Sequence, residues 1–221
     1  MSGAGGALAV LLGALLAGAP GAARAVPPEP TRDQALAALA DHGDVEARRR
    51  GAQWLGTTGT MADLAALARA LRDPDAVVRA LSERAMWEVW SRSGDEAADR
   101  LLSVGIEQMN ARHGEAAAET FTKVIERRPD FAEGWNKRAT VYYLLGEYQK
   151  SLADCDEVMK RNPYHFGALS GYGMIYLQLG QPALALTYFE KALDVNPNLH
   201  QVRETVDALR QLIIQRGRGT I

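Results

Sequence analysis

Cysteine and net positive charge are what this sequence has least of. Its 221 residues include one cysteine, Cys155, which excludes a disulfide within the chain and any zinc or iron–sulfur site built from several thiolates. Lys and Arg number 25 against 27 Asp and Glu, so the net charge is −2. No overall basic field is therefore available to hold phosphates, and we expect no nucleic-acid partner.

Motifs that carry catalytic chemistry are also missing. The four histidines, at positions 42, 113, 165 and 200, are far apart and share no ligand spacing. The chain has no Gly-rich phosphate loop, no nucleophile elbow and no HExxH pattern. With 47% hydrophobic and 24% charged residues, the composition is that of an ordinary folded protein. The sequence predicts a protein that is not an enzyme and needs no metal or cofactor.

The first segment has the pattern of a targeting signal. Residues 7–17 are an unbroken apolar run, and the small-residue triplet Ala23-Arg24-Ala25 follows it. The run is too short to span a bilayer, which takes about 20 apolar residues. The usual positive charge is missing, because residues 1–6 contain no Lys or Arg. We expect a secretory signal cleaved after Ala25, export to a bacterial periplasm, and a Pro-rich linker over residues 26–32.

The remaining chain is predicted to be helical and repetitive. From Asp33 onward apolar residues recur three and four positions apart, and Thr31 with Gln34 fits a capping box. Columns of similar residues recur at an interval of 34 positions. They are Pro129, Pro163 and Pro197; Gly105, Ala139 and Gly173; and Phe121, Cys155 and Phe189.

These columns resemble the tetratricopeptide repeat, whose unit is a 34-residue helix-turn-helix. Three units are predicted, over residues 98–131, 132–165 and 166–199. The third matches the repeat best, with Leu169, Gly173, Tyr176, Gly180, Ala185, Phe189, Ala192 and Pro197. The first departs at Gln108, where an aromatic residue is usual, and at Arg112, where the turn glycine is usual. The internal turn of the first unit is therefore an open question.

Two weaker copies precede these units at an interval of 31 residues. Asp44 with Arg48 aligns with Asp75 with Arg79, and the Asp73-Pro74-Asp75 turn resembles that of a HEAT-like repeat. Residues 33–95 are thus either HEAT-like helix pairs or a generic four-helix cap that covers the end of the stack. Residues 200–216 have an amphipathic pattern and are predicted to form a closing helix, followed by a flexible tail over 217–221. The predicted fold is an all-α, right-handed helical-repeat solenoid.

Three local features have ordinary structural interpretations. Cys155 occupies the column of Phe121 and Phe189, so we expect a buried thiol rather than a nucleophile. In the run Arg48-Arg49-Arg50, a helix spreads the side chains around its axis, which favours one structural arginine and two solvated ones. For His113 and His165 we expect solvated or capping roles.

One face of the first helix in each unit is predicted to line a groove that holds a partner. In tetratricopeptide proteins this concave face receives peptides, and here it is mostly apolar. Its residues are Leu102, Ile106, Met109, Asn136, Thr140, Tyr143, Ser170, Met174 and Leu177. The expected function is an exported scaffold that binds an apolar or helical segment of a protein in an envelope assembly.

Two alternatives to this function stay open. The groove could carry a lipid or another small hydrophobe, or it could be filled by the closing helix or by the upstream helices. A terminal carboxylate is not an expected ligand. The family's carboxylate clamp would need Lys, Arg or Asn at positions where this chain has Leu102, Ile106, Lys137, Gly167 and Gly171, and Lys137 alone fits that pattern.

Overall fold

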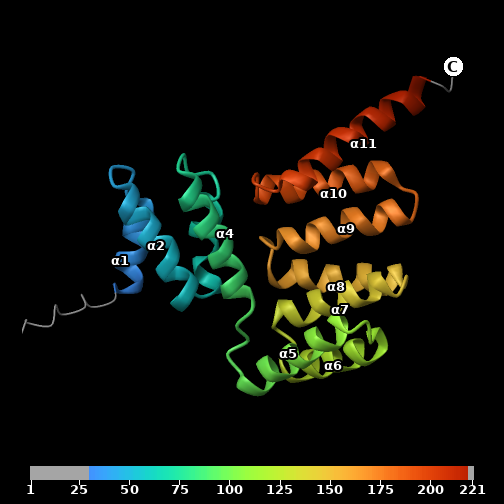
Figure 1. The fold of residues 1–221 in the computed structure, drawn as a ribbon, viewed down its shortest axis with the longest axis horizontal. Helices are drawn as coiled ribbons and strands as arrows, with labels where there is room; N and C mark the ends of the chain where they lie inside the picture. Colours follow the sequence, from blue (N-terminus) through green and yellow to red (C-terminus); the bar gives the residue numbers. More distant parts are fainter. Residues whose placement is uncertain (1–29, 219–221) are drawn as a thin grey trace, which may run out of the picture.

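The computed structural model describes residues 30–218, which form helices joined by loops (Figure 1). The predicted signal peptide and residues 26–29 of the predicted linker lie outside the described residues. The first helix begins at Arg32, so the last residue of that predicted linker is helical. Thr31 caps this helix: its hydroxyl accepts from the Gln34 amide while the Gln34 side chain accepts from the Thr31 amide, as the capping-box pattern predicts.

Residues 32–90, here called the N-terminal region, form two successive helix pairs. The elements are α1 (Arg32–Ala40), α2 (Val45–Thr58), a 3-10 helix (Met61–Asp63), α3 (Leu64–Ala70) and α4 (Ala76–Trp90). The copies predicted at an interval of 31 residues correspond to α2 and α4. Asp44 caps α2 by accepting from the Ala47 amide, and Asp75 caps α4 by accepting from the Val78 amide.

Two arginines of the run 48–50 join these helix pairs. Arg48 is buried and pairs with Asp73 at 2.7 Å, while it also donates to the carbonyl oxygen of Asp41. Arg49 pairs with Asp75 at 2.7 Å. The prediction of a single structural arginine was therefore wrong: α2 packs against α4, which brings the cap of α4 within reach of Arg49 as well. Arg50 is exposed, as expected of a solvated arginine.

The three predicted repeat units are antiparallel helix pairs. They are α5 (Glu96–Asn110) with α6 (Gly114–Arg127), α7 (Ala132–Leu144) with α8 (Tyr148–Arg161), and α9 (Phe166–Gln178) with α10 (Pro182–Val195). The helices α7 and α9 begin at the first residues of the predicted second and third units. Arg112 has a φ of 61°, close to the 76° of Gly146 and the 69° of Gly180. The internal turn of the first unit therefore forms in the same left-handed conformation without a glycine.

The closing helix α11 (His200–Arg218) packs on α10. Val206 and Leu209 on its inner face join Ala185 and Phe189 in one buried cluster, which closes the core of the third unit. The predicted boundary at residue 216 was wrong, because the helix continues through the first two positions of the predicted tail. The rest of that tail, 219–221, lies outside the described residues.

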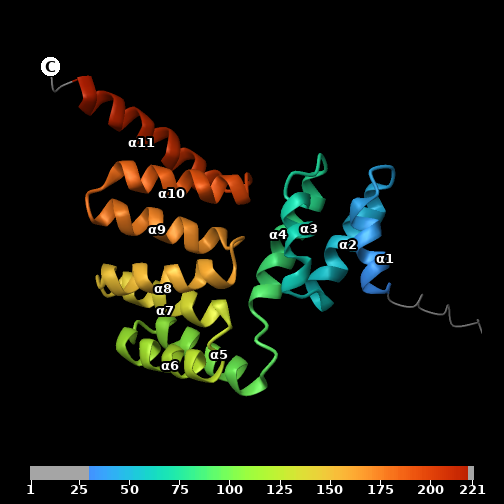
Figure 2. The ribbon, with the colours of Figure 1, turned by 180° about the vertical axis from the view of Figure 1, so that it is seen from behind.

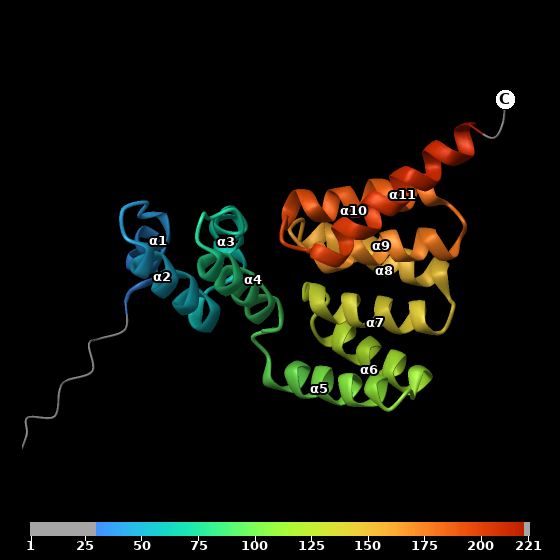
Figure 3. The same ribbon diagram turned by 45° about the horizontal axis from the view of Figure 1, so that its top comes forward.

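The N-terminal region lies beside the repeat units, not on top of the first one. Figure 1 shows α4 next to the beginning of α9, and Figure 2 shows the same arrangement from behind. In Figure 3 the connection from α4 runs along the side of the units to reach α5. Phe166, the first residue of α9, belongs to the buried cluster of the N-terminal region. A cap over the end of the first unit, one of the two predicted arrangements, is therefore not what the chain forms.

The contacts that hold this arrangement involve the loops between successive repeat units. The connecting residues 91–95 lead from the N-terminal region to the first unit, where Asp95, the cap of α5, pairs with Arg127 of α6 at 2.8 Å. At the junction of the second and third units, the ring of His165 stacks on Trp90 with centroids 4.4 Å apart. After the third unit, Asn198 accepts from Arg79 at 3.0 Å and donates to the carbonyl oxygen of Leu71 at 2.8 Å. The N-terminal region thus contacts the loops at the two ends of the third unit, before α9 and after α10.

Candidate functional site

The first helices of the second and third units enclose a small groove. Its cavity of about 260 Å³ lies between α7 and α9. Five of the nine side chains predicted to line a groove meet here: Asn136, Thr140 and Tyr143 from α7, and Ser170 and Met174 from α9. Their spacing along each helix places them on one face, and the contact between α7 and α9 brings the two faces together. None of the lining residues carries a formal charge.

The first predicted triplet lies elsewhere. Leu102 is 6% exposed and belongs to a buried cluster with Phe131 and Val141, so it packs into the second unit and does not face an open groove. Ile106 and Met109 are half-buried against the same cluster. The expectation that this triplet lines the groove was therefore wrong, because these apolar side chains bury themselves in the contact between neighbouring units. Leu177 is partly exposed but lies outside the cavity.

Glycine makes the room in this groove. A Cβ atom on Gly171 would meet only the Sγ atom of Cys155, at an ordinary 3.8 Å, so the space above this residue is open. Gly167 also lines the cavity, and a Cβ there would come within 2.9 Å of Cη2 of Trp87. In the sequence, both glycines stood out only because they occupy positions where the family's carboxylate clamp has Lys, Arg or Asn. The open space above Gly171 and the close contact of Gly167 with α4 were missed, although two glycines one turn apart on the same helix face are a readable signal.

The floor of the groove includes a protected thiol. Cys155 is 2% exposed, and burial raises the pKa of its thiol to about 12, with the charges of Asp154 and Asp156 adding to the effect. Those carboxylates face different helices: Asp154 pairs with Arg138 of α7 at 2.8 Å, and Asp156 accepts from the Tyr172 hydroxyl of α9. Because the thiolate is the reactive form, Cys155 acts here as a packing residue, as predicted.

The amide of Asn136 is held in one orientation by a buried carboxylate. Its Nδ2 atom donates to Glu133 at 3.2 Å. An ionised carboxylate only accepts hydrogen bonds, so the NH₂ group must face Glu133, and Oδ1 is left as an acceptor. Burial acts to raise the pKa of Glu133, but the hydrogen bond from His165 and the Lys137 ammonium lower it below its usual value. Glu133 therefore stays ionised and keeps this amide in place.

His165 connects the groove to the N-terminal region. Its Nδ1 atom accepts from the Ala168 amide at 3.1 Å and caps α9, so the ring proton is on Nε2, which donates to Glu133 at 3.1 Å. The same ring is fully buried and stacks on Trp90. The capping role expected of His165 is confirmed. His113 is exposed before α6 and makes no side-chain cap.

Neither the closing helix nor the upstream helices fill the groove. Every residue that lines its cavity comes from α7, α8 or α9. The closing helix packs on α10 instead, and Met174 is 45% exposed. The N-terminal region reaches only one end of the groove, where Trp87 touches Gly167. The predicted alternative of a self-filled groove is therefore wrong for the described residues.

Residues 30–218 contain no group of three or more His, Cys, Asp or Glu residues placed to hold a metal ion. No helix in the part of the chain that the structure describes is long and apolar enough to cross a membrane.

Known proteins resemble this chain in sequence. The family model "Tetratricopeptide repeat" matches residues 130–198. A TPR repeat-containing protein of Rhizobium etli is 33% identical over 140 residues, which covers 63% of this chain and 68% of that protein. The chain belongs to the tetratricopeptide repeat (TPR) family. The matched residues include both helices that form the groove.

Solved TPR structures share the fold. The Sgt2 TPR domain of Aspergillus fumigatus superposes with a TM-score of 0.54 at 19% identity, covering 57% of this chain and 85% of that one. The first TPR of Spaghetti (RPAP3), bound to an HSP90 peptide, gives a TM-score of 0.51 at 20% identity, covering 53% and 93%. The HEAT-like interpretation of the N-terminal region stays a prediction.

Proposed function

We propose that this TPR protein is a non-catalytic scaffold that binds an apolar or helical segment of a protein partner in the groove between α7 and α9. The observation that carries the proposal is the open space above Gly171, which is bordered by uncharged side chains including the exposed Met174. Met and aromatic side chains adapt to apolar ligands, and the oriented Asn136 amide offers one acceptor to a peptide N–H.

The structure of Spaghetti with its HSP90 peptide supports peptide binding by this fold. That peptide is acidic, and an acidic peptide is not the ligand that we propose for this chain. The lysine that matches the clamp pattern, Lys137, is already paired with the buried Glu133 at 2.9 Å. Leu102 is buried in the core, and Gly167 and Gly171 have no side chains to offer. The ligand that suits this groove is therefore an apolar segment and not a terminal carboxylate.

A lipid or small hydrophobe is the rival ligand, and the size of the groove favours a peptide. Sites that enclose small molecules usually measure about 300 to 1,000 Å³, and this cavity of about 260 Å³ lies below that range. A co-purifying lipid found by mass spectrometry of the isolated protein would reverse that preference.

Export to the periplasm and a place in an envelope assembly are part of the proposal. They rest on the apolar run of residues 7–17 and the small-residue triplet that ends at Ala25. Sequencing the amino terminus of the protein from its native host tests this: a mature chain that starts at Val26 in the periplasmic fraction supports export. An intact Met1 in the cytosol would overturn it.

The groove can be tested with a variant that blocks it without disturbing the core. Gly171→Leu places a side chain in the open space, whereas Gly171→Ala adds one methyl group that fits at an ordinary contact distance. In crosslinking pull-downs from the envelope fraction, we expect the wild type and Gly171→Ala to recover the same partner and Gly171→Leu to lose it. Melting temperatures should not fall, since both residues favour helix over glycine by up to about 1 kcal/mol.

Tyr143→Ala and Met174→Ala complete this test. Met174 is exposed, so its loss should weaken capture by about 1 to 3 kcal/mol and leave the melting temperature nearly unchanged. Tyr143 also packs against Tyr148, with ring centroids 5.9 Å apart, so its removal should lower stability as well as capture. Stability loss with unchanged capture in both variants, together with full capture by Gly171→Leu, would refute the groove.

A further inference from the structure

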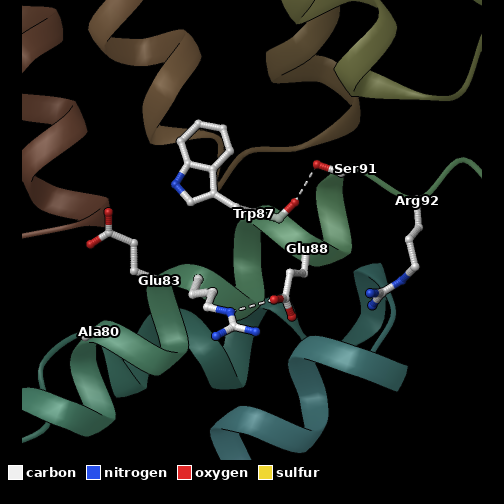
Figure 4. Close-up of a pocket in the computed structure, with 7 residues that line it drawn as sticks. Ala80, Glu83, Trp87, Glu88, Ser91 and Arg92 are labelled. Carbon is white, nitrogen blue, oxygen red and sulfur yellow. Dashed lines mark hydrogen bonds and ion pairs between the residues drawn. The ribbon is translucent and has the colours of Figure 1, made fainter. Parts of the chain in front are cut away.

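A second, shallow depression, here called the α4 cleft, lies on the face of α4 that carries Trp87. This cleft of about 700 Å³ is lined by α4 and the turn that follows it. Figure 4 shows Trp87 and Glu83 extending from α4 toward the ribbon of the repeat units, while Glu88 points to the opposite side. Trp87 is half-buried and presents part of its indole to the cleft.

Most charges around the cleft are already satisfied. Arg92 donates to the carbonyl oxygens of Gly56 and Gly59, each at 2.7 Å, and Arg84 pairs with Glu88 at 2.6 Å. Within residues 30–218, the carboxylate of Glu83 makes no hydrogen bond or ion pair. The cleft therefore combines one unpaired anion with an indole one helical turn away.

The cleft and the groove are neighbours. Trp87 lines the cleft and Gly167 lines the groove, and a Cβ atom on Gly167 would come within 2.9 Å of Cη2 of Trp87. On the groove side, the nearest fixed polar group is the Asn136 amide, whose Oδ1 accepts no hydrogen bond from the described residues. Both polar groups along this path, the Glu83 carboxylate and the Asn136 Oδ1, are acceptors.

We propose that the partner segment runs from the groove across Trp87 into the α4 cleft, and that it places a Lys or Arg side chain over Trp87 where it pairs with Glu83. This inference rests on the proposed function and adds the chemistry of the partner, which has apolar residues next to a Lys or Arg residue. A cation is stabilised by the indole face and by a carboxylate. An acidic residue would be repelled by Glu83, and the two arginines of the lining are already engaged, Arg84 with Glu88 and Arg92 with carbonyl oxygens.

The N-terminal region is in this view part of the binding surface. The groove alone, at about 260 Å³, is smaller than most ligand sites, and the cleft of about 700 Å³ beside it adds surface for further residues of a peptide. The stacking of Trp90 on His165 and the bonds of Asn198 hold α4 at the mouth of the groove. The residues that would bind the basic side chain, Glu83 and Trp87, therefore lie on α4, outside the three TPR units.

The test uses the full chain and a phage-displayed library of random peptides. Peptides are selected on the wild type and counter-selected on Gly171→Leu, so that only groove-dependent ligands remain. Synthetic copies are then titrated against wild type, Glu83→Lys, Glu83→Gln and the matched control Glu119→Lys, an exposed glutamate on α6. We expect the selected peptides to share a Lys or Arg next to apolar residues.

Glu83→Gln should weaken these peptides by about fivefold, the size of a partly exposed ion pair, and Glu83→Lys should weaken them further and select acidic peptides instead. Glu119→Lys should bind like the wild type. Groove-dependent peptides that carry no base, that are acidic, or that bind Glu83→Lys unchanged would overturn this inference and leave the groove intact. If no peptide distinguishes the wild type from Gly171→Leu, the proposed function fails and this inference fails with it.

Discussion

The α-carbon of Gly173 faces the ring of Phe189 so closely that a Cβ atom would lie 2.5 Å from Cε1. The same relationship joins Gly105 and Phe121, also at 2.5 Å, two units earlier. In the middle unit the column holds Ala139, and the facing residue is the smaller Cys155. Within each unit the small residue on the first helix is thus matched in size to the residue on the second, which allows the two helices to approach closely.

Gly173→Leu should overpack this contact. We expect a loss of about 1 to 3 kcal/mol or more in the free energy of unfolding, because the ring of Phe189 is buried and has no room to move. Gly173→Ala should also destabilise, although alanine is the better helix former. The matched control is Gly171→Ala on the same helix, where the new methyl meets only an ordinary contact. Equal denaturant midpoints for the two alanine variants would contradict this packing.

Cys155 should resist thiol reagents in the native state and react once the chain unfolds. Burial raises the pKa of its thiol from 9.0 to about 12, so the native state keeps a proton that the unfolded state releases. This contribution to stability is complete below about pH 9 and is lost as the pH rises toward 12. The wild type should therefore lose more stability than Cys155→Ala over that range, and parallel pH profiles of the two proteins would disprove the effect.

Arg112→Gly should stabilise the first repeat unit. A non-glycine residue at a φ of 61° is strained by its Cβ atom, and glycine removes that strain at the small cost of a more flexible unfolded chain. We expect a net gain of about 0.5 to 1 kcal/mol in thermal or urea unfolding.

The opposite substitution in the second unit is its control. Gly146→Ala, at a φ of 76° with open space around it, should cost about 1 kcal/mol. If Arg112→Gly and Gly146→Ala changed the free energy of unfolding in the same direction, the two turns would not share the same left-handed strain.

Asn198→Ala should loosen the N-terminal region from the repeat units without touching either core. It removes the bonds to Arg79 and to the Leu71 carbonyl oxygen, so we expect about 1 to 3 kcal/mol less docking free energy. Hydrogen exchange should become faster at the start of α9 and in α4. Asn110→Ala, an exposed asparagine at the end of α5, is the control. Unchanged exchange in Asn198→Ala would mean that the aromatic contacts and the bonds of Arg72 to the carbonyl oxygens of Asp194 and Val195 hold the two parts together without Asn198.

Only some of the residues that line the groove could be predicted from the sequence, and a comparison of Leu102 with Met174 shows why. Both occupy inner-face positions of their units, and no local pattern separates them. Leu102 is buried in a cluster with Phe131 and with Val141 of the next unit, whereas Met174 is 45% exposed beside the two glycines of α9. Which inner side chains stay open depends on how far neighbouring helices tilt and on the size of residues across the contact. Neither is encoded in the spacing of a single helix.

The helices, their caps and the 34-residue register follow from the sequence by itself, because they depend on contacts between residues close along the chain. Gly173 and Phe189 are 16 positions apart, and a periodic pattern records such pairs in every unit. The position of the N-terminal region was decided only by the tertiary structure. Arg79 meets Asn198, and Trp90 stacks on His165, across long stretches of chain and once each. A contact that occurs once leaves no repeat in the sequence, so its partners become visible only when the chain is folded.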